Sequence, residues 1–348
     1  MHYIWDKKYR FYAAFNPKTG YYLRSNCCDA QGKQTAEEPF MASFPHLFDI
    51  GVMGHCIHGK LGYCLKAGVT CYQDGPNRSE PNMPLAAFEQ IIRQCRGRVF
   101  QVALGGRGDP DQHENFADLL TCCTQNGIIP NFTTSGFGMT KVIADLCQQH
   151  CGAVAVSWYR QPHTLEAIRL LLGSGVKTNI HYVLNLDTLD LAVYLLESGL
   201  LPDGINAVLF LLHKPVGLGS NDKILRMDDS RVSRFFRLIE SRTWPFKIGF
   251  DSCSVPALVN FTYNVDPGSI DTCEGGRFSA YISPDLKMLP CSFDQSWHWS
   301  CDVSHQSLQQ AWESRAFDAF RNQLRTACPD CPDRLTCLGG CPICPEIV

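Results

Sequence analysis

Three cysteines lie close together in a glycine-rich stretch, GHCIHGKLGYCLKAGVTCYQDG, at residues 54–75. Cys56, Cys64 and Cys71 follow the pattern C-x7-C-x6-C, which matches none of the tight C-x2-C patterns of zinc sites. Thiolates are soft ligands that suit zinc and iron–sulfur clusters, and two thiols can also form a disulfide. The spacing alone therefore leaves three kinds of site open.

The composition favours metal ligation over disulfides. The chain has 19 cysteines in 348 residues, yet its first residues, MHYIWDKKYRFYAAFNPKTG, contain no apolar export signal. We therefore predict a cytoplasmic protein whose thiols stay reduced. The net charge of −3 and the apolar fraction of 45% are those of an ordinary globular protein, so we expect neither a nucleic acid nor a membrane as partner.

Between residues 47 and 253, short apolar runs alternate with amphipathic segments. This rhythm predicts an α/β fold with parallel strands and outer helices, closed or nearly closed into a partial barrel. The predicted strands are 47–53, 99–106, 128–136, 153–159, 177–185, 205–213 and 246–253, and the clearest helices are 84–97, 113–127, 140–152, 163–175 and 230–242.

Polar or glycine-rich segments follow the first four predicted strands. The cysteine loop follows the first strand, GGRGDP (105–110) follows the second, TTSG (133–136) ends the third, and Ser157 with Arg160 comes at the end of the fourth. Because parallel strands of a barrel present their carboxyl ends at one mouth, we expect these segments to face a common ligand.

The alternation stops near residue 260. A predicted hairpin (271–294) is bounded by Cys273 and Cys291, and one helix (307–325) precedes a cysteine-dense tail. We therefore predict an N-terminal extension (1–46), a barrel (47–260) and a small cysteine-rich domain (261–348). The tail cysteines are Cys328, Cys331, Cys337, Cys341 and Cys344.

In these features the sequence resembles the radical S-adenosylmethionine (SAM) superfamily with a C-terminal SPASM-type extension. That family binds a [4Fe–4S] cluster through three cysteines after the first strand, usually spaced C-x3-C-x2-C, and SAM binds the open iron. Cys71 is followed by tyrosine, as the family's last cysteine often is, but eight extra residues separate Cys56 from Cys71. His55 and His58 are possible additional ligands, although we expect them to be solvated loop residues.

The resemblance also implies a SAM site. In the family a GGE-P turn after the second strand meets the SAM amino group, and GGRGDP offers Gly105, Gly106 and Asp109 for that part. Glycine lets the backbone come close, and a carboxylate suits an ammonium group. The alternative is a plain tight turn between strand and helix. Candidates for the SAM ribose and carboxylate are Thr134, Ser135 and Ser157.

The tail carries the family's C-x2-C-x5-C-x3-C spacing, which implies one or two auxiliary [4Fe–4S] clusters. By the family pattern, a distal cluster would use Cys328, Cys331, Cys337 and Cys344. A proximal cluster would use Cys273, Cys291 and Cys341, completed by Cys253 or by a substrate atom. A zinc ribbon is the alternative for the tail, because C-x2-C pairs also bind zinc.

The implied reaction is reductive cleavage of SAM to a 5′-deoxyadenosyl radical, which abstracts a hydrogen atom from a peptide or protein. A flavodoxin- or ferredoxin-type protein would donate the electron. Asp251 and Cys253, at the end of the last barrel strand, are expected to meet the substrate, with His213 or Lys214 nearby. The alternatives are a small-molecule substrate, a role in cofactor maturation, or a non-catalytic iron–sulfur or zinc scaffold. The first 46 residues are too few for the peptide-recognition domain that often precedes the barrel, although residues 15–26 read as a hairpin.

Overall fold

A small antiparallel sheet opens the chain. The computed structural model describes residues 1–344, and its first element is a three-stranded sheet in the order β1-β2-β3. The predicted hairpin at 15–26 corresponds to the turn between β2 and β3. The strands are β1 (His2–Asp6), β2 (Phe11–Phe15) and β3 (Tyr22–Arg24).

A ten-stranded sheet forms the body of the protein. Its order is β10-β9-β8-β7-β6-β5-β4-β11-β12-β13, and all pairs from β10 to β11 are parallel. The first seven strands in sequence order agree with the predicted barrel strands, which confirms the mostly parallel α/β fold. They are β4 (Leu47–Met53), β5 (Gln101–Gly106), β6 (Ile129–Thr134), β7 (Val154–Ser157), β8 (Thr178–Leu184), β9 (Ala207–Leu212) and β10 (Lys247–Phe250).

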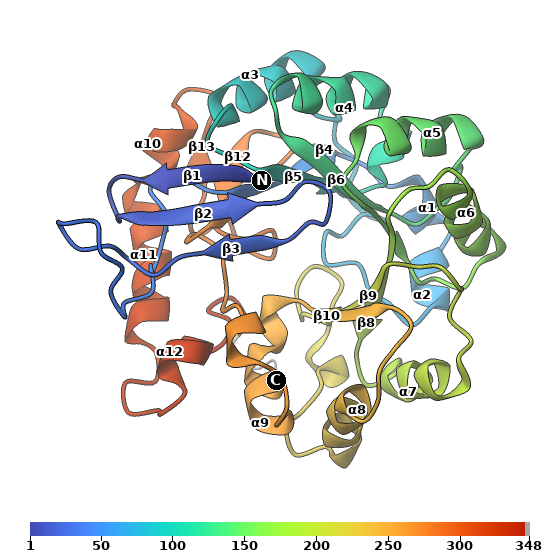
Figure 1. Cartoon of the computed structure of the whole chain (residues 1–348). Coiled ribbons are helices and arrows are strands. Elements are labelled where there is room, and N and C mark those ends of the chain that lie inside the picture. The colour runs from blue at the N-terminus through green and yellow to red at the C-terminus, as the bar shows by residue number, and fades with distance from the viewer. Residues whose placement is uncertain (345–348) are drawn as a thin grey trace.

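Helices cover the outer face of this sheet. Figure 1 shows α3 to α8 following one another around the outside of the strands, as the alternating sequence pattern predicts. These six helices are α3 (Leu85–Cys95), α4 (Phe116–Gln125), α5 (Lys141–His150), α6 (Pro162–Gly173), α7 (Leu189–Ser198) and α8 (Ser230–Glu240). Short turns of 3-10 helix are η1 (Pro110–Gln112), η2 (Asn221–Lys223), η3 (Ser252–Ser254) and η4 (Pro267–Ser269).

The inner face of the sheet carries polar side chains on β6 and β8. Along β8 buried residues alternate with half-buried ones, and the half-buried positions include Asn179 and His181. In β6, which β7 separates from β8, the half-buried positions include Asn131 and Thr133, and the Thr133 hydroxyl lies 3.2 Å from His181 Nδ1. Because alternate residues of a strand face opposite sides, the apolar residues pack under the helices while the polar residues line the interior. The interior is therefore suited to a polar ligand.

The C-terminal segment extends the same sheet. β11 (Ser279–Ile282) pairs in parallel with β4, and β12 (Lys287–Leu289) and β13 (Cys301–Asp302) continue in antiparallel order. The predicted boundary near residue 260 falls at the end of α9 (Val255–Phe261), and the strands beyond it are not separate from the barrel. The remaining helices of this segment are α10 (Leu308–Trp312), α11 (Arg315–Thr326) and α12 (Arg334–Cys337).

The three predicted segments share hydrophobic cores. Trp312 and Phe317 of the C-terminal helices belong to the same core as the barrel strands. Phe11 and Phe15 of the N-terminal sheet pack with Phe100 and Phe278. Both flanking segments are thus fixed to the barrel by apolar burial, which is the main favourable term in folding.

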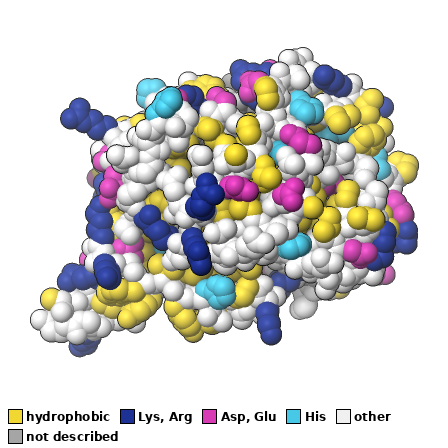
Figure 2. Space-filling view, turned by 90° about the horizontal axis from the view of Figure 1, so that it is seen from above, with side chains coloured by type: hydrophobic (Ala, Val, Ile, Leu, Met, Phe, Trp, Pro, Cys, Tyr) yellow, Lys and Arg dark blue, Asp and Glu magenta, His cyan; other side chains and the backbone are white. Residues whose placement is uncertain are grey.

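The surface carries mixed charge. On the face shown in Figure 2, basic and acidic side chains are interspersed, in agreement with the small net charge. Across the described part of the chain, no helix is both long enough and apolar enough to cross a bilayer.

Candidate functional site

The cysteine loop folds into two single-turn helices after β4. Cys56 caps the first helix, α1 (Ile57–Lys60), with its Sγ accepting a hydrogen bond from the Gly59 amide at 3.1 Å. Cys64 lies in the second, α2 (Tyr63–Lys66), and is buried. The extra residues of the loop are therefore folded, and they bury two of the three thiols.

The loop then returns so that Cys71 lies beside Cys56. The Cys71 Sγ accepts a hydrogen bond from the Gly75 amide at 3.3 Å. A Cβ atom at Gly75 would lie 2.9 Å from the Cys56 Cβ and 3.5 Å from the Cys71 Sγ, so only glycine fits between these cysteines. Burial raises the pKa of Cys71, and the nearby thiols of Cys64 and Cys56 raise it further. The structure thus brings the three predicted ligands together.

His58 lies among these thiols, and the expectation of a solvated loop histidine is wrong for it. Its ring nitrogens lie 3.6 Å from the Cys56 Sγ, and Nδ1 lies 3.3 Å from Asp109 Oδ2. Burial alone would lower the pKa of His58, but hydrogen bonds to Asp109 and to the thiols of Cys56 and Cys64 raise it. Its buried position depends on the loop packing against the next strand end, which local sequence cannot reveal.

The turn after β5 packs directly against the cysteine loop. Cβ atoms at Gly106 and Gly108 would lie 2.4 Å from the Met53 oxygen and 2.3 Å from the His55 oxygen, so both glycines permit this close approach. Gly106 also has a φ of 117°, a conformation that other residues rarely adopt. Gly105, in contrast, has open space on the side that a Cβ would occupy, with no neighbouring atom within 4 Å of it.

Asp109 joins the predicted SAM-site residues to the cysteine loop. Its Oδ1 accepts the Ser135 amide at 2.9 Å, and its Oδ2 accepts the Ser135 hydroxyl and contacts His58. Thr134 is fully buried, and its hydroxyl accepts the Gly136 amide at 2.9 Å. Ser157 ends β7 in a half-buried position. Asp109 and Ser135 therefore form one unit, whereas Thr134 supports the turn that follows β6.

Asp111 is a buried carboxyl that the sequence reasoning missed. Neither of its oxygens has a hydrogen-bond partner among the described residues. Burial and the adjacent Asp109 raise the pKa of Asp111 to about 7. The signal in the sequence was the second aspartate of GGRGDPD, two residues after Asp109.

A second group of thiols lines a cavity of 630 Å³ between the barrel and the C-terminal segment. A thiol hydrogen bond with Cys341 and burial both raise the pKa of Cys253. Burial raises the pKa of Cys291 as well, followed by the nearby Cys253 and Cys273. The structure thus gathers the three predicted proximal ligands and Cys253, the candidate for the fourth.

The predicted distal ligands are not all brought together. Cys328 and Cys331 are exposed, and they lie near Cys337, whose pKa is raised by burial and then by these two thiols. Cys344 is buried elsewhere, where its amide donates to the Cys341 Sγ at 3.4 Å. Within residues 1–344, no three thiol, imidazole or carboxylate groups converge tightly enough to hold a single ion as they stand. The cysteines of the loop and those of the cavity nevertheless offer soft sulfur donors, the ligands that iron–sulfur clusters take.

The other predicted substrate residues form an ion pair beside the same cavity. The buried Lys214 ammonium pairs with Oδ2 of Asp251, a residue of the cavity wall, and lies 4.6 Å from the centre of the Phe293 ring. Burial alone would lower the pKa of Lys214, but Asp251 raises it. His213 Nε2 lies 3.0 Å from the Ser220 carbonyl oxygen, so this side chain supports its own loop.

Comparison with known proteins supports both the fold and the iron–sulfur site in the C-terminal segment. Residues 273–332 match the family model of SPASM, an iron–sulfur cluster-binding domain. A search of curated protein sequences gave no match.

Solved structures share the fold at low sequence identity. Streptococcus suis SuiB bound to S-adenosylmethionine has a TM-score of 0.66 and 17% identity, covering 88% of this chain and 76% of SuiB. SuiB bound to its precursor peptide SuiA has a TM-score of 0.61 and 17% identity, covering 88% and 75% of the two chains. The native protein anSMEcpe with bound AdoMet has a TM-score of 0.57 and 15% identity, covering 86% and 90%. The predicted fold and iron–sulfur domain are therefore confirmed.

Proposed function

We propose that this chain, which combines the radical SAM fold with a SPASM iron–sulfur domain, is an enzyme that cleaves S-adenosylmethionine reductively and abstracts a hydrogen atom from a peptide or protein. The observation that carries this proposal is the contact between the cysteine loop and the turn after β5. His58 lies between Cys56 of that loop and Asp109 of that turn.

In the proposed site Cys56, Cys64 and Cys71 hold a [4Fe–4S] cluster. That cluster, when bound, supplies the electron that splits SAM into methionine and a 5′-deoxyadenosyl radical, and a flavodoxin- or ferredoxin-type donor replaces the electron. Asp109, with Gly105 and Gly106 at the end of β5, receives the SAM ammonium group. Glycine backbone and a carboxylate suit this cation, because charge-assisted hydrogen bonds are about twice as strong as neutral ones.

The four cysteines that line the 630 Å³ cavity would hold an auxiliary cluster. Cys253, Cys273, Cys291 and Cys341 supply four sulfur donors at one cavity, so no substrate atom is needed to complete the set. Cys328, Cys331 and Cys337 form a separate exposed group. Beside the cavity, the Lys214 ammonium is paired with Asp251, and this pair would face the substrate.

The substrate that we propose is a peptide or a protein. Two structures of similar fold were solved with peptides: SuiB with the precursor peptide SuiA, and anSMEcpe with the Cp18Cys peptide. The 630 Å³ cavity would be shared between the auxiliary cluster and the part of the substrate that enters it. Its polar wall includes Asp251, at the end of β10.

The test is anaerobic reconstitution of the wild type and of the variant in which Cys56, Cys64 and Cys71 are all alanine. The wild type should release 5′-deoxyadenosine from SAM in the presence of a reductant. The variant should lose about four irons and all SAM cleavage, yet keep iron, sulfide and absorption near ~400 nm from its auxiliary thiolates. Continued 5′-deoxyadenosine formation by the variant would refute the cluster assignment. Stoichiometric zinc without residual iron in the variant would refute the auxiliary cluster.

A further inference from the structure

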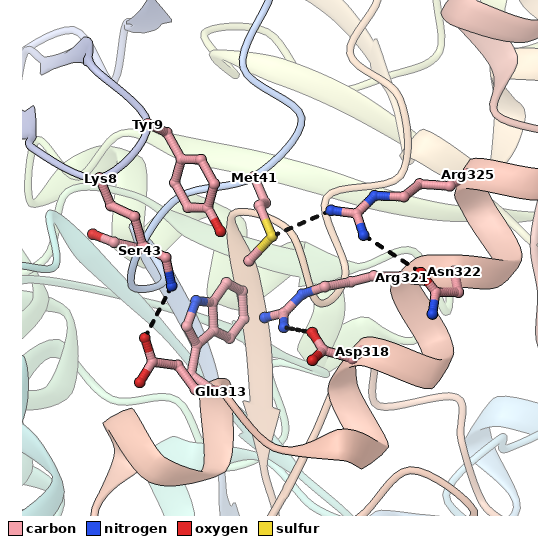
Figure 3. Close-up of a pocket in the computed structure, with 10 residues that line it drawn as sticks. Lys8, Tyr9, Met41, Ser43, Glu313, Asp318, Arg321, Asn322 and Arg325 are labelled. Carbon is pink, nitrogen blue, oxygen red and sulfur yellow. Dashed lines mark hydrogen bonds and ion pairs between the residues drawn. The ribbon is translucent and has the colours of Figure 1, made fainter.

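A separate pocket of 380 Å³ lies between the N-terminal sheet and helices α10 and α11. The turn after β1 contributes Lys8 and Tyr9 to its wall, and α11 contributes Arg321 and Arg325 (Figure 3). Phe320, the residue before Arg321, lines the thiol cavity instead. The pocket and the thiol cavity therefore lie on two sides of one helix.

Arg321 is a buried cation with one unused donor group. Its side chain is 1% exposed, and its guanidinium lies 4.4 Å from the centre of the Trp312 ring. Nε donates to the Gly276 oxygen at 2.6 Å and Nη1 to Asp318 at 3.0 Å. Nη2 is buried without a hydrogen-bond partner among residues 1–344. A buried donor without a partner is costly, so this nitrogen favours an incoming acceptor.

Two further donors at the same pocket have no anionic partner in the described chain. The Arg325 guanidinium lies 4.4 Å from the centre of the Phe40 ring and donates to the Asn322 amide oxygen at 3.4 Å and to the Met41 sulfur at 3.8 Å, so none of its contacts in residues 1–344 is with a carboxylate. In Figure 3 the Tyr9 hydroxyl points into the same space beside Met41.

The carboxylates at the pocket are already paired. Glu313 pairs with Lys8 at 3.2 Å and Asp318 with Arg321. Three cations thus face two carboxylates, which leaves a positive charge and several donors for an anion.

We propose that this pocket binds the carboxylate of an acidic side chain in the peptide substrate, with Arg325, Arg321 and Tyr9 as donors. A planar carboxylate matches the donor fork of arginine, and Trp312 and Met41 can contact the aliphatic part of a glutamate. The inference rests on the proposed peptide substrate. An acidic residue held here would anchor the peptide on one side of α11 while another part of it reaches the thiol cavity.

The test compares two peptides, acetyl-Gly-Glu-Gly-amide and acetyl-Gly-Gln-Gly-amide, by ligand-observed NMR with the reconstituted full chain. The wild type should bind the glutamate peptide at least tenfold more tightly than the glutamine peptide. Arg325→Gln should remove that preference, and Tyr9→Phe should reduce it. Arg169→Gln is the matched control, because Arg169 is an exposed arginine on α6 paired with Glu166.

Equal affinity for the two peptides, or an unchanged preference in Arg325→Gln, would overturn the proposal. Binding of free glutarate without binding of the glutamate peptide would overturn the peptide assignment in favour of a small carboxylate. Arg321 is left unchanged because its contacts with Trp312 and Gly276 support the fold. SAM cleavage measured in the same preparations separates failure of this inference from failure of the proposed activity.

Discussion

Asp109 is expected to have two roles that two substitutions can separate. Its carboxylate accepts the Ser135 amide and hydroxyl inside the protein, and we propose that it also binds the SAM ammonium group. Asp109→Ala removes both roles. Because it leaves two buried polar groups of Ser135 without their partner, the free energy of unfolding should fall by roughly 2–6 kcal/mol. SAM binding should weaken as well.

Asp109→Asn keeps the contacts with Ser135, removes the charge and weakens the contact of Oδ2 with His58. Its amide oxygen can still accept the Ser135 N–H, and its NH2 group can donate to the Ser135 hydroxyl. A hydrogen bond to a charged group contributes about 1.5–3 kcal/mol, so the SAM dissociation constant should rise roughly 10- to 100-fold. Isothermal titration with SAM measures this, and denaturation curves measure stability. If Asp109→Asn binds SAM as tightly as the wild type while Asp109→Ala does not, Asp109 is a structural residue and the turn is a plain turn.

Two further predictions concern charges near the proposed sites. Lys214→Gln removes a buried cation close to Cys253 and Cys291, so the midpoint potential of the auxiliary centre should fall by about 60 mV, a tenfold change for one electron. An EPR-monitored redox titration measures the potential, with Lys223→Gln as control. Equal potentials in Lys214→Gln and the wild type would contradict the reasoning. Asp111→Asn replaces a carboxyl whose pKa is raised from 3.8 to about 7 in the folded state. Because the folded state holds this proton more tightly than the unfolded state, the wild type loses stability as pH rises from about 4 to 7, and the asparagine variant does not. The variant should therefore gain about 1–3 kcal/mol over the wild type at pH 8 and less at pH 5, measured by chemical denaturation, and a gain that does not depend on pH would count against the raised pKa.

Local pattern predicted the parallel strands well. The apolar runs at 47–53 and 205–213 correspond to β4 and β9 within a few residues, because such runs are typical of strands covered by helices. Glycine-rich turns marked the strand ends, and the cysteine loop after the first strand was correctly placed beside the turn at 105–110. Cys253, which no motif includes, lines the thiol cavity, and its part as a cluster ligand or substrate-facing residue stays a prediction.

Contacts between distant segments could not be predicted from local pattern. The pairing of β11 with β4 joins residues more than two hundred positions apart, so the C-terminal segment was expected to be separate. Cys344 has a spacing that fits the tail cysteines, yet the fold buries it beside Cys341. Asp111 is marked in the sequence only as the second aspartate of GGRGDPD, and its burial without partners is a property of the packed turn.

The long interval between Cys56 and Cys71 shows why spacing along the chain is a weak guide to distance in space. Eight residues of the loop lie in α1 and α2, and a helix advances only about 1.5 Å per residue, compared with about 3.3 Å in an extended chain. Much of the extra length is therefore taken up without moving the cysteines apart. The same folding places His58 on α1, where it reaches both Cys56 and Asp109. His58 thus connects a proposed cluster ligand to the proposed SAM ligand.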